Sequence, residues 1–275
     1  MTGPAGSASR VPLSGIRAIT FDFGNTLVQV RRAALDLVTA QTATEAAASL
    51  GLGDPAPFRA AWAEERGRQF LEEVPVFREV DLEQRSVRVL ARLRGMPPPP
   101  AGVRWDDAAA GRLSAPAEVA AILDGYSRAF VAAMPPVEAA GPVIAGLATR
   151  GFTLAILSNW PLAATVDRYA AAAGWDRHLA GIFVSQRIGT IKPHPAIFAF
   201  ASAALGIPPR QILHVGDDWA ADVVGAGRAG WRVAYLRDHQ ADTPLPTSVR
   251  TAETIPDLEL DRLADLPARI ADPTT

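Results

Sequence analysis

The chain has 275 residues, 49% of them hydrophobic, which suffices for a full core in one large domain or two smaller ones. A formal net charge of -2 gives no basic field that would attract nucleic acid or an anionic membrane. The absence of cysteine excludes disulfides, thiolate metal sites and a cysteine nucleophile. No apolar run approaches the roughly 20 residues that span a bilayer, and the start lacks a hydrophobic targeting segment. We therefore expect a cytoplasmic protein with a flexible tail at residues 1–15 and with neither nucleic acid nor a membrane as partner.

Short apolar runs bounded by turn residues recur along the chain, as is typical of strands in a buried parallel sheet. Helix-like stretches separate the last four runs, and this alternation predicts an open, Rossmann-like α/β sheet. The predicted strands are Ala18–Phe23, Thr153–Leu157, Gly181–Val184, Ile212–Val215 and Arg232–Leu236, and the predicted helices between them are Val137–Ala148, Leu162–Ala173, Pro195–Leu205 and Trp219–Ala229.

Residues 32–135 interrupt this rhythm. They are rich in Ala, Leu, Arg and Glu at helical spacing, as in Ala33–Leu50 and Pro57–Glu73, and they lack convincing strands. Prolines 97–100 mark a loop inside the stretch. We predict an α-helical cap domain at 32–135, inserted into a core domain made of residues 16–31 and 136–275.

Polar residues follow the predicted strands. In open α/β sheets ligands bind outside the carboxyl ends of the strands. Asp22, Ser158, Lys192 and Asp217 each follow a strand or lie in a loop leading away from one. We therefore expect them to converge on one crevice, where an aspartate at a strand end can present its carboxylate as a nucleophile.

Lys192 is the only lysine of the chain, although lysine and arginine together number 27. A bias toward arginine explains why lysine is scarce but not why one is kept. Because a compact ammonium and a planar guanidinium are not equivalent beside an anion, this exception points to a functional role.

Together these motifs resemble the haloacid dehalogenase-like (HAD) hydrolase superfamily, in its subgroup with a helical, C1-type cap. The resemblance covers most of residues 16–236 apart from the insert. The matching motifs, in chain order, are Asp22-Phe23-Gly24-Asn25-Thr26, Leu157-Ser158-Asn159, Ile191-Lys192-Pro193 and Val215-Gly216-Asp217-Asp218-Trp219-Ala220-Ala221-Asp222.

The resemblance implies a role for each motif in phosphoryl transfer. Asp22 would attack phosphorus and form an aspartyl-phosphate, and Lys192 would neutralise charge on the nucleophile and on the transferring group. Thr26, Ser158 and Asn159 would bind the phosphoryl oxygens together with Lys192.

The acidic residues suit Mg²⁺, which prefers oxygen ligands. The resemblance implies that Asp22, Asp217, Asp218 and the backbone carbonyl of Gly24 hold the ion, with Asp222 in support. A rival interpretation is that Asp217 and Asp218 only cap the helix that follows them.

Gly24 is the main departure from the family pattern, because phosphatases of this superfamily carry a second aspartate there that protonates the leaving alcohol. A Mg²⁺-dependent phosphohydrolase acting on a small phosphorylated metabolite ranks first, and restoring an aspartate at position 24 should raise its turnover of alkyl phosphates. A degenerate phosphate- and metal-binding module ranks second. A metal-independent haloacid dehalogenase ranks third, because Asp217 and Asp218 would repel its anionic substrate.

Overall fold

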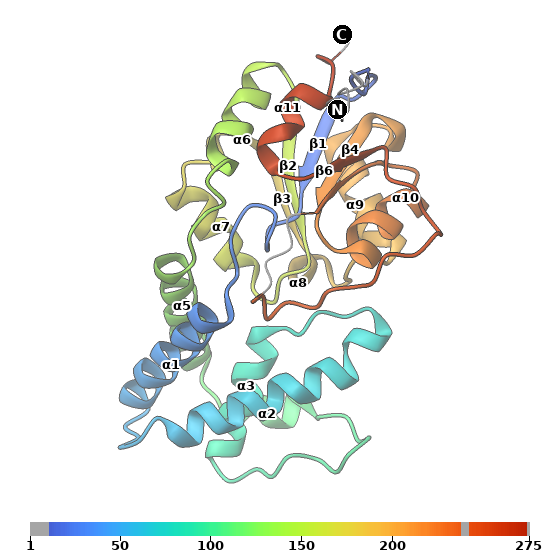
Figure 1. Cartoon of the computed structure of the whole chain (residues 1–275). Coiled ribbons are helices and arrows are strands. Elements are labelled where there is room, and N and C mark those ends of the chain that lie inside the picture. Colours follow the sequence, from blue (N-terminus) through green and yellow to red (C-terminus); the bar gives the residue numbers. More distant parts are fainter. Residues whose placement is uncertain (1–10, 238–241, 274–275) are drawn as a thin grey trace, which may run out of the picture.

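The computed structural model describes residues 11–237 and 242–273. Most of the expected N-terminal tail therefore lies outside the described residues. Leu13, which belongs to that tail, forms a parallel bridge with Ile270, and its N–H donates to the carbonyl of Arg269 at 2.8 Å. The two ends of the described chain thus lie side by side at one edge of the molecule (Figure 1).

A six-stranded, wholly parallel sheet forms the centre of the core and confirms the predicted α/β class. Its strand order is β3-β2-β1-β4-β5-β6. The five predicted strands are present, although β1 ends two residues earlier than expected, and a short sixth strand was not predicted. The strands are β1 (Ala18–Phe21), β2 (Thr153–Ser158), β3 (Leu179–Val184), β4 (Ile212–Gly216), β5 (Arg232–Leu236) and β6 (Leu258–Leu260).

Apolar side chains alternate between the two faces of this sheet, and each face has its own hydrophobic cluster. Helices α6 and α7 cover one face, while α9, α10 and the π-helical segment η4 cover the other (Figure 1). The expected helix Trp219–Ala229 is thus divided between η4 and α10. The bounds are α6 (Ala140–Thr149), α7 (Ala163–Ala172), α8 (Ser185–Ile188), α9 (Pro195–Leu205), η4 (Trp219–Val224), α10 (Gly225–Arg228) and α11 (Leu266–Arg269); short 3-10 turns are η2 (Asp176–His178), η3 (Pro209–Gln211) and η5 (Leu263–Asp265).

A helical layer lies below the carboxyl end of the sheet, between β1 and β2 in the sequence (Figure 1). Its longest pair, α1 and α5, pack along each other, and α2 packs on α3. The elements are α1 (Arg32–Ser49), α2 (Ala56–Glu72), the 3-10 turn η1 (Val74–Val76), α3 (Leu82–Leu93), α4 (Asp107–Gly111) and α5 (Pro116–Ala133).

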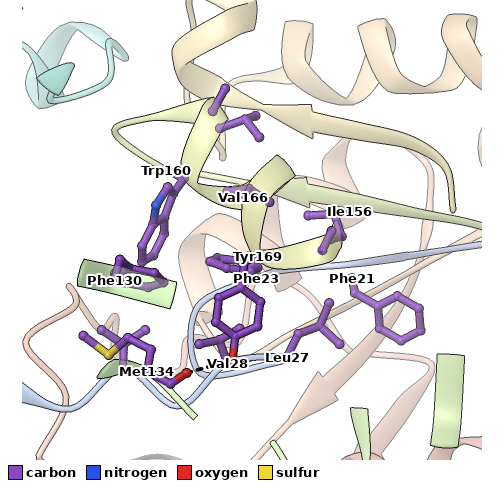
Figure 2. Packing of buried hydrophobic residues seen from close by; sticks show 14 of the residues in the cluster. Phe21, Phe23, Leu27, Val28, Phe130, Met134, Ile156, Trp160, Val166 and Tyr169 are labelled. Atoms are coloured by element: carbon purple, nitrogen blue, oxygen red, sulfur yellow. Dashed lines mark hydrogen bonds between the residues drawn. The ribbon is translucent and has the colours of Figure 1, made fainter. Parts of the chain in front are cut away.

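An aromatic cluster connects this helical layer to the sheet. Phe23, which is fully buried, lies with its ring centroid 5.1 Å from Trp160 and 5.4 Å from Tyr169 (Figure 2). Phe130 of α5 reaches the same group, 5.1 Å from Trp160. Edge-to-face contacts of this kind add to the hydrophobic gain of burial. The turn after β1 is therefore held from below by packing as well as by the sheet.

Among the described residues, no helix combines the length and the apolar character needed to cross a bilayer.

Candidate active site

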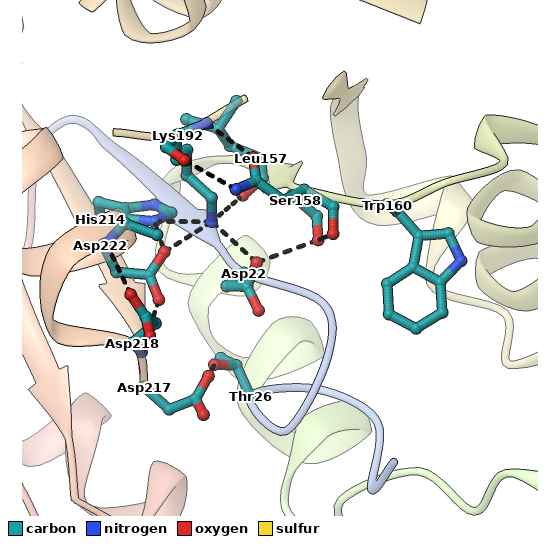
Figure 3. Close-up of polar contacts among 12 residues, drawn as sticks. Asp22, Thr26, Leu157, Ser158, Trp160, Lys192, His214, Asp217, Asp218 and Asp222 are labelled. Carbon is teal, nitrogen blue, oxygen red and sulfur yellow. Dashed lines mark hydrogen bonds and ion pairs between the residues drawn. The ribbon is translucent and has the colours of Figure 1, made fainter. Parts of the chain in front are cut away.

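Asp22 stands at the centre of the candidate site. Its backbone N–H donates to the carbonyl of Val215 on β4 at 2.8 Å. This hydrogen bond continues the pairing of β1 with β4 by one residue and fixes the backbone of Asp22. Carboxylate Oδ1 accepts from Ser158 Oγ at 3.0 Å and from Lys192 Nζ at 2.8 Å (Figure 3). Oδ2 makes no hydrogen bond with any described residue. Burial raises the pKa of Asp22 to about 6, against the opposing effect of Lys192.

Lys192 is 2% exposed and is surrounded by acceptors. Besides Asp22, its Nζ donates to the carboxylate of Asp222 at 2.6 Å and to the carbonyl of Leu157 at 2.9 Å. Burial alone would lower the pKa of Lys192, but the two carboxylates outweigh it and raise that pKa. The only lysine of the chain is thus a fixed positive charge beside Asp22, in the place that the sequence analysis expected.

Asp222 supports Lys192 directly rather than through water. Its Oδ1 also lies 3.0 Å from His214 Nε2, and its Oδ2 accepts from the backbone N–H of Asp218 at 2.9 Å. His214 is fully buried on β4, and its Nδ1 lies 2.8 Å from Thr20 Oγ1. Burial and the nearby Lys192 lower the pKa of His214, so the neutral ring donates from Nε2 to Asp222 and accepts at Nδ1.

Ser158 and Asn159 follow β2, and the structure gives them different tasks. The Ser158 hydroxyl bonds Asp22, as described. The Asn159 side chain instead forms two hydrogen bonds with the backbone of Lys192. Its Oδ1 accepts from the N–H at 2.7 Å, and its Nδ2 donates to the carbonyl at 2.9 Å. Asn159 therefore holds the loop that carries Lys192, a role that the sequence did not indicate.

Asp217 follows β4 and is 6% exposed, yet no described cation lies within ion-pairing distance of it. Its carboxylate receives only long hydrogen bonds, from Asn25 Nδ2 and from Thr26 Oγ1, both at 3.4 Å. Burial, and then the charges of Asp22 and Asp222, raise the pKa of Asp217 well above its usual range. Thr26 is fully buried, and its hydroxyl faces Asp217.

Asp218 differs from Asp217 although the two are adjacent. Its Oδ1 accepts from the backbone N–H of Ala221 at 2.7 Å and from Ser248 Oγ at 2.9 Å, so it caps the segment η4. Within the described chain, the acidic group whose oxygens lie within 4.8 Å of one another consists of Asp22, Asp217 and Asp222. The helix-cap interpretation thus fits Asp218 but not Asp217.

Gly24 is covered by a segment that the sequence analysis did not connect with the site. We call residues 242–251, between β5 and β6, the covering segment. An ideal Cβ at Gly24 would lie 2.6 Å from Leu245 Cδ1 and 3.2 Å from the Trp160 ring. Two anchors hold the segment in place: Asn25 Nδ2 donates to Thr243 Oγ1 at 3.1 Å, and Ser248 bonds Asp218.

A cavity of about 650 Å³ connects this crevice with the helical layer. At one end it is lined by Asp22, Lys192 and Asp217, and at the other by Trp62, Arg85 and Tyr126. Its wall is mostly apolar and aromatic. The carboxylates and the lysine therefore face a cavity large enough for a small organic molecule.

A parallel α/β sheet with an acidic crevice at its carboxyl edge and a helical layer facing that crevice defines a broad class of small-molecule enzymes. Within that class the chain belongs to the haloacid dehalogenase-like hydrolase family, whose model matches residues 16–230. This confirms the resemblance that the four motifs carried.

Several curated relatives are phosphatases. Glyceraldehyde 3-phosphate phosphatase of Methanopyrus kandleri is 30% identical over 151 residues, which are 55% of this chain and 63% of that protein. Phosphoglycolate phosphatase of Haemophilus influenzae is 36% identical over 90 residues, which are 33% of this chain and 39% of that protein. The chain thus spans less than two thirds of the length of these relatives.

Solved structures share the fold at lower sequence identity. A 2-haloacid dehalogenase from Pseudomonas syringae superposes with a TM-score of 0.63 at 24% identity, covering 92% of this chain and 96% of that one. A HAD phosphatase from Thermococcus onnurineus superposes with a TM-score of 0.59 at 17% identity, covering 94% of this chain and 100% of that one. Phosphatases and dehalogenases share this architecture, so side chains must distinguish between them.

Proposed function

We propose that the protein is a Mg²⁺-dependent phosphohydrolase that acts on a small phosphorylated metabolite through an aspartyl-phosphate on Asp22. An Asp22 oxygen would attack phosphorus while the bond from phosphorus to the leaving oxygen breaks. Water would then attack the same phosphorus, releasing inorganic phosphate and restoring the carboxylate. The phosphatase names of the curated relatives support this choice of substrate class.

The single observation that carries the proposal is the state of the Asp22 carboxylate. Lys192 and Ser158 both hold Oδ1, while Oδ2 has no partner among the described residues and Asp22 lines the cavity. An oxygen held in a fixed direction without a hydrogen bond of its own is suited to nucleophilic attack. Lys192 and Ser158 remain beside it to stabilise charge on the transferring group.

The donor set fits a divalent cation. Asp217 is a buried carboxylate with no cationic partner among the described residues, beside Asp22 and Asp222, and an ion there would offset this concentration of negative charge. We propose that Asp22, Asp217 and the backbone carbonyl of Gly24 hold Mg²⁺. Asp222 would support the site through Lys192, and Asp218 through its cap on η4. When bound, the ion would neutralise charge on the nucleophile and on the phosphoryl oxygens.

The same carboxylates weigh against the dehalogenase alternative. A haloacid substrate carries its own carboxylate, which a buried Asp217 without a cation would repel. Asp217 is therefore better explained by phosphoryl transfer with a metal than by metal-independent chemistry on carbon.

The glycine at position 24 limits which leaving groups the proposed hydrolysis can release efficiently. With glycine there, no side chain at that position protonates the departing oxygen, a form of help typically worth about 100- to 10,000-fold. Efficient turnover is therefore expected for aryl or acyl phosphates, whose leaving groups are stable without a proton.

Hydrolysis of an activated aryl phosphate tests the proposal. The wild-type protein with Mg²⁺ should turn over 4-nitrophenyl phosphate, and Asp22→Asn should abolish this while Asp176→Asn, at an exposed aspartate, retains it. Activity without added metal in the presence of a chelator, or equal rates for Asp22→Asn and the wild type, would overturn the mechanism. If the wild type binds Mg²⁺ and phosphate but shows no turnover, the degenerate binding module becomes the better description.

A further inference from the structure

The helical layer contributes to the cavity wall a buried cation that has no counterion among the described residues. Arg85 of α3 is 4% exposed, and its Nε donates to Gln69 Oε1 at 2.9 Å. Its Nη2 reaches the carbonyl of Val80 at 3.5 Å, while its Nη1 makes no hydrogen bond with a described residue. No described carboxylate lies within ion-pairing distance of this guanidinium. Burial lowers the pKa of Arg85 to about 9, so it remains cationic at neutral pH.

The two carboxylates whose charges act on Arg85, those of Glu79 and Asp81, are engaged elsewhere. Glu79 accepts from the Ser185 hydroxyl and from the N–H of Val80 at 2.9 Å. Asp81 caps α3 by accepting from the N–H of Glu83 at 2.6 Å. Arg88, another buried arginine of the helical layer, differs from Arg85 because it forms an ion pair with Asp107 at 2.7 Å.

Tyr126 of α5 lies beside Arg85, and its hydroxyl also has unused hydrogen-bonding capacity. It is 6% exposed, lines the cavity, and its hydroxyl makes no hydrogen bond with a described residue. Burial raises the pKa of Tyr126 to about 12, so the hydroxyl is a donor at neutral pH. Trp62 connects the two side chains, because the Arg85 guanidinium stands 5.1 Å from its ring and the Tyr126 ring lies 6.3 Å from it.

Leaving a buried guanidinium without an anion is costly. A carboxylate offers two planar oxygens, which match the donors of a guanidinium and of a neighbouring phenol. Arg66, an exposed residue at the same cavity, contributes a second positive charge. The mostly apolar wall of the cavity suits an apolar or aromatic body.

We propose that Arg85 and Tyr126 form a second anion-binding subsite, which holds a carboxylate on the leaving group of the phosphorylated substrate. Its phosphoryl group would lie at Asp22, and an apolar body would pack along Trp62 and Trp160 between the two anions. This inference rests on the proposed phosphohydrolase function and narrows its substrate to carboxylated phosphate esters.

Matched pairs of aryl phosphates test the subsite. The carboxyphenyl phosphates with the acid at the 2, 3 or 4 position are compared with their carboxamides, which keep the shape but lack the charge. A hydrogen bond to a charged group is worth roughly 10- to 100-fold in binding. For at least one pair, kcat/KM of the wild-type protein should favour the acid by about tenfold or more.

Tyr126→Phe is the sharpest variant, because it removes only a hydroxyl that bonds nothing described in the protein. It should reduce the acid-to-amide preference by roughly 3- to 10-fold. Arg85→Gln should bring the preference close to one, and the use of a ratio cancels any general loss of folding or rate. Tyr169→Phe is the matched control: its hydroxyl bonds the carbonyl of Met134 at 2.9 Å, outside the cavity, so the preference should stay at the wild-type value.

Binding measured without chemistry separates this inference from the proposed function. Calorimetry with benzylphosphonate and its carboxylated counterparts, in Mg²⁺, should show the same preference and the same losses in the two variants. Hydrolysis through Asp22 with no acid preference, or with a preference that Tyr126→Phe and Arg85→Gln leave unchanged, would overturn the subsite and leave the function standing. A calorimetric preference lost in both variants, but without turnover, would retain the subsite and reject the phosphohydrolase.

Discussion

Leu245 occupies the space in which a side chain at position 24 would begin: its Cδ1 lies 2.6 Å from the place where a Gly24 Cβ would stand. Carbon atoms do not approach so closely, so any larger residue at position 24 requires Leu245 to move. The missing acid has therefore left no vacant pocket. An apolar side chain, delivered by a segment more than 200 residues away in the sequence, fills its position.

This contact changes the expected result of restoring the acid. Gly24→Asp alone should destabilise the protein by about 1–3 kcal/mol through overpacking and should give little gain on alkyl phosphates. Adding Leu245→Ala should relieve the clash and raise turnover of an alkyl phosphate at least about tenfold, within the range of general acid catalysis. Steady-state kinetics and urea unfolding of both single variants and the double variant provide the measurement. A double variant no faster than Leu245→Ala would show that the pocket cannot use the acid.

Lys192 should be needed for both stability and rate. Lys192→Met leaves the carboxylates of Asp22 and Asp222 buried without their cation, which typically costs about 3–5 kcal/mol. Loss of a charge-stabilising donor typically costs about 100- to 1,000-fold in kcat. Lys192→Arg should also fail, because a planar fork does not reproduce a compact ammonium with three acceptors. Urea unfolding and aryl phosphate kinetics measure both effects, and wild-type behaviour of either variant would contradict the assigned role.

Asp217→Asn should have opposite effects on the stability of the folded protein with and without metal. Without Mg²⁺ it removes a buried carboxylate whose pKa is raised by burial and by the charges of Asp22 and Asp222, so the stability of the metal-free protein should rise. A ligand at 100 times its Kd stabilises the wild type by about 2.7 kcal/mol, and the variant should lose most of this increment. Thermal unfolding with and without Mg²⁺ measures the difference. Asp218→Asn is the matched control, since its carboxylate caps η4, and the reverse pattern would make Asp218 the ligand.

The raised pKa of Asp22 predicts a pH dependence of stability. Because that pKa is about 6 in the folded protein and about 3.9 in unfolded chains, the folded form binds more protons between these values. The stability that Asp22 contributes is therefore full below pH 4 and is lost as the pH rises through 6. The metal-free wild type should lose on the order of 2 kcal/mol relative to Asp22→Asn across this window. Urea unfolding at several pH values tests the sign, and a difference that stays flat or grows with pH would contradict it.

The strands, and the convergence of Asp22, Ser158, Lys192 and Asp217 at one edge of the sheet, were predictable because each rests on a local pattern. Apolar runs between turns identify buried parallel strands, and the topology then brings the residues that follow them to one edge. The short strand β6 was missed because Leu258–Leu260 offers only three residues between acidic neighbours.

The distribution of roles among the acidic residues could not be deduced from spacing alone. Asp217, Asp218 and Asp222 stand within six positions, yet the turn into η4 directs one toward the cavity, one onto the helix end and one toward Lys192. The covering segment and the pair Arg85–Tyr126 were also beyond sequence patterns. Both depend on which loop or helix face meets the crevice, and only long-range packing determines that.

The burial of Lys192 also has a consequence for chemical and enzymatic modification. The side chain of the chain's one lysine is 1% exposed, and its ammonium is protonated and held by two carboxylates, so reagents that acylate amines cannot reach it in the folded protein. Acylation of a lysine side chain would therefore report unfolding of the crevice that holds Lys192.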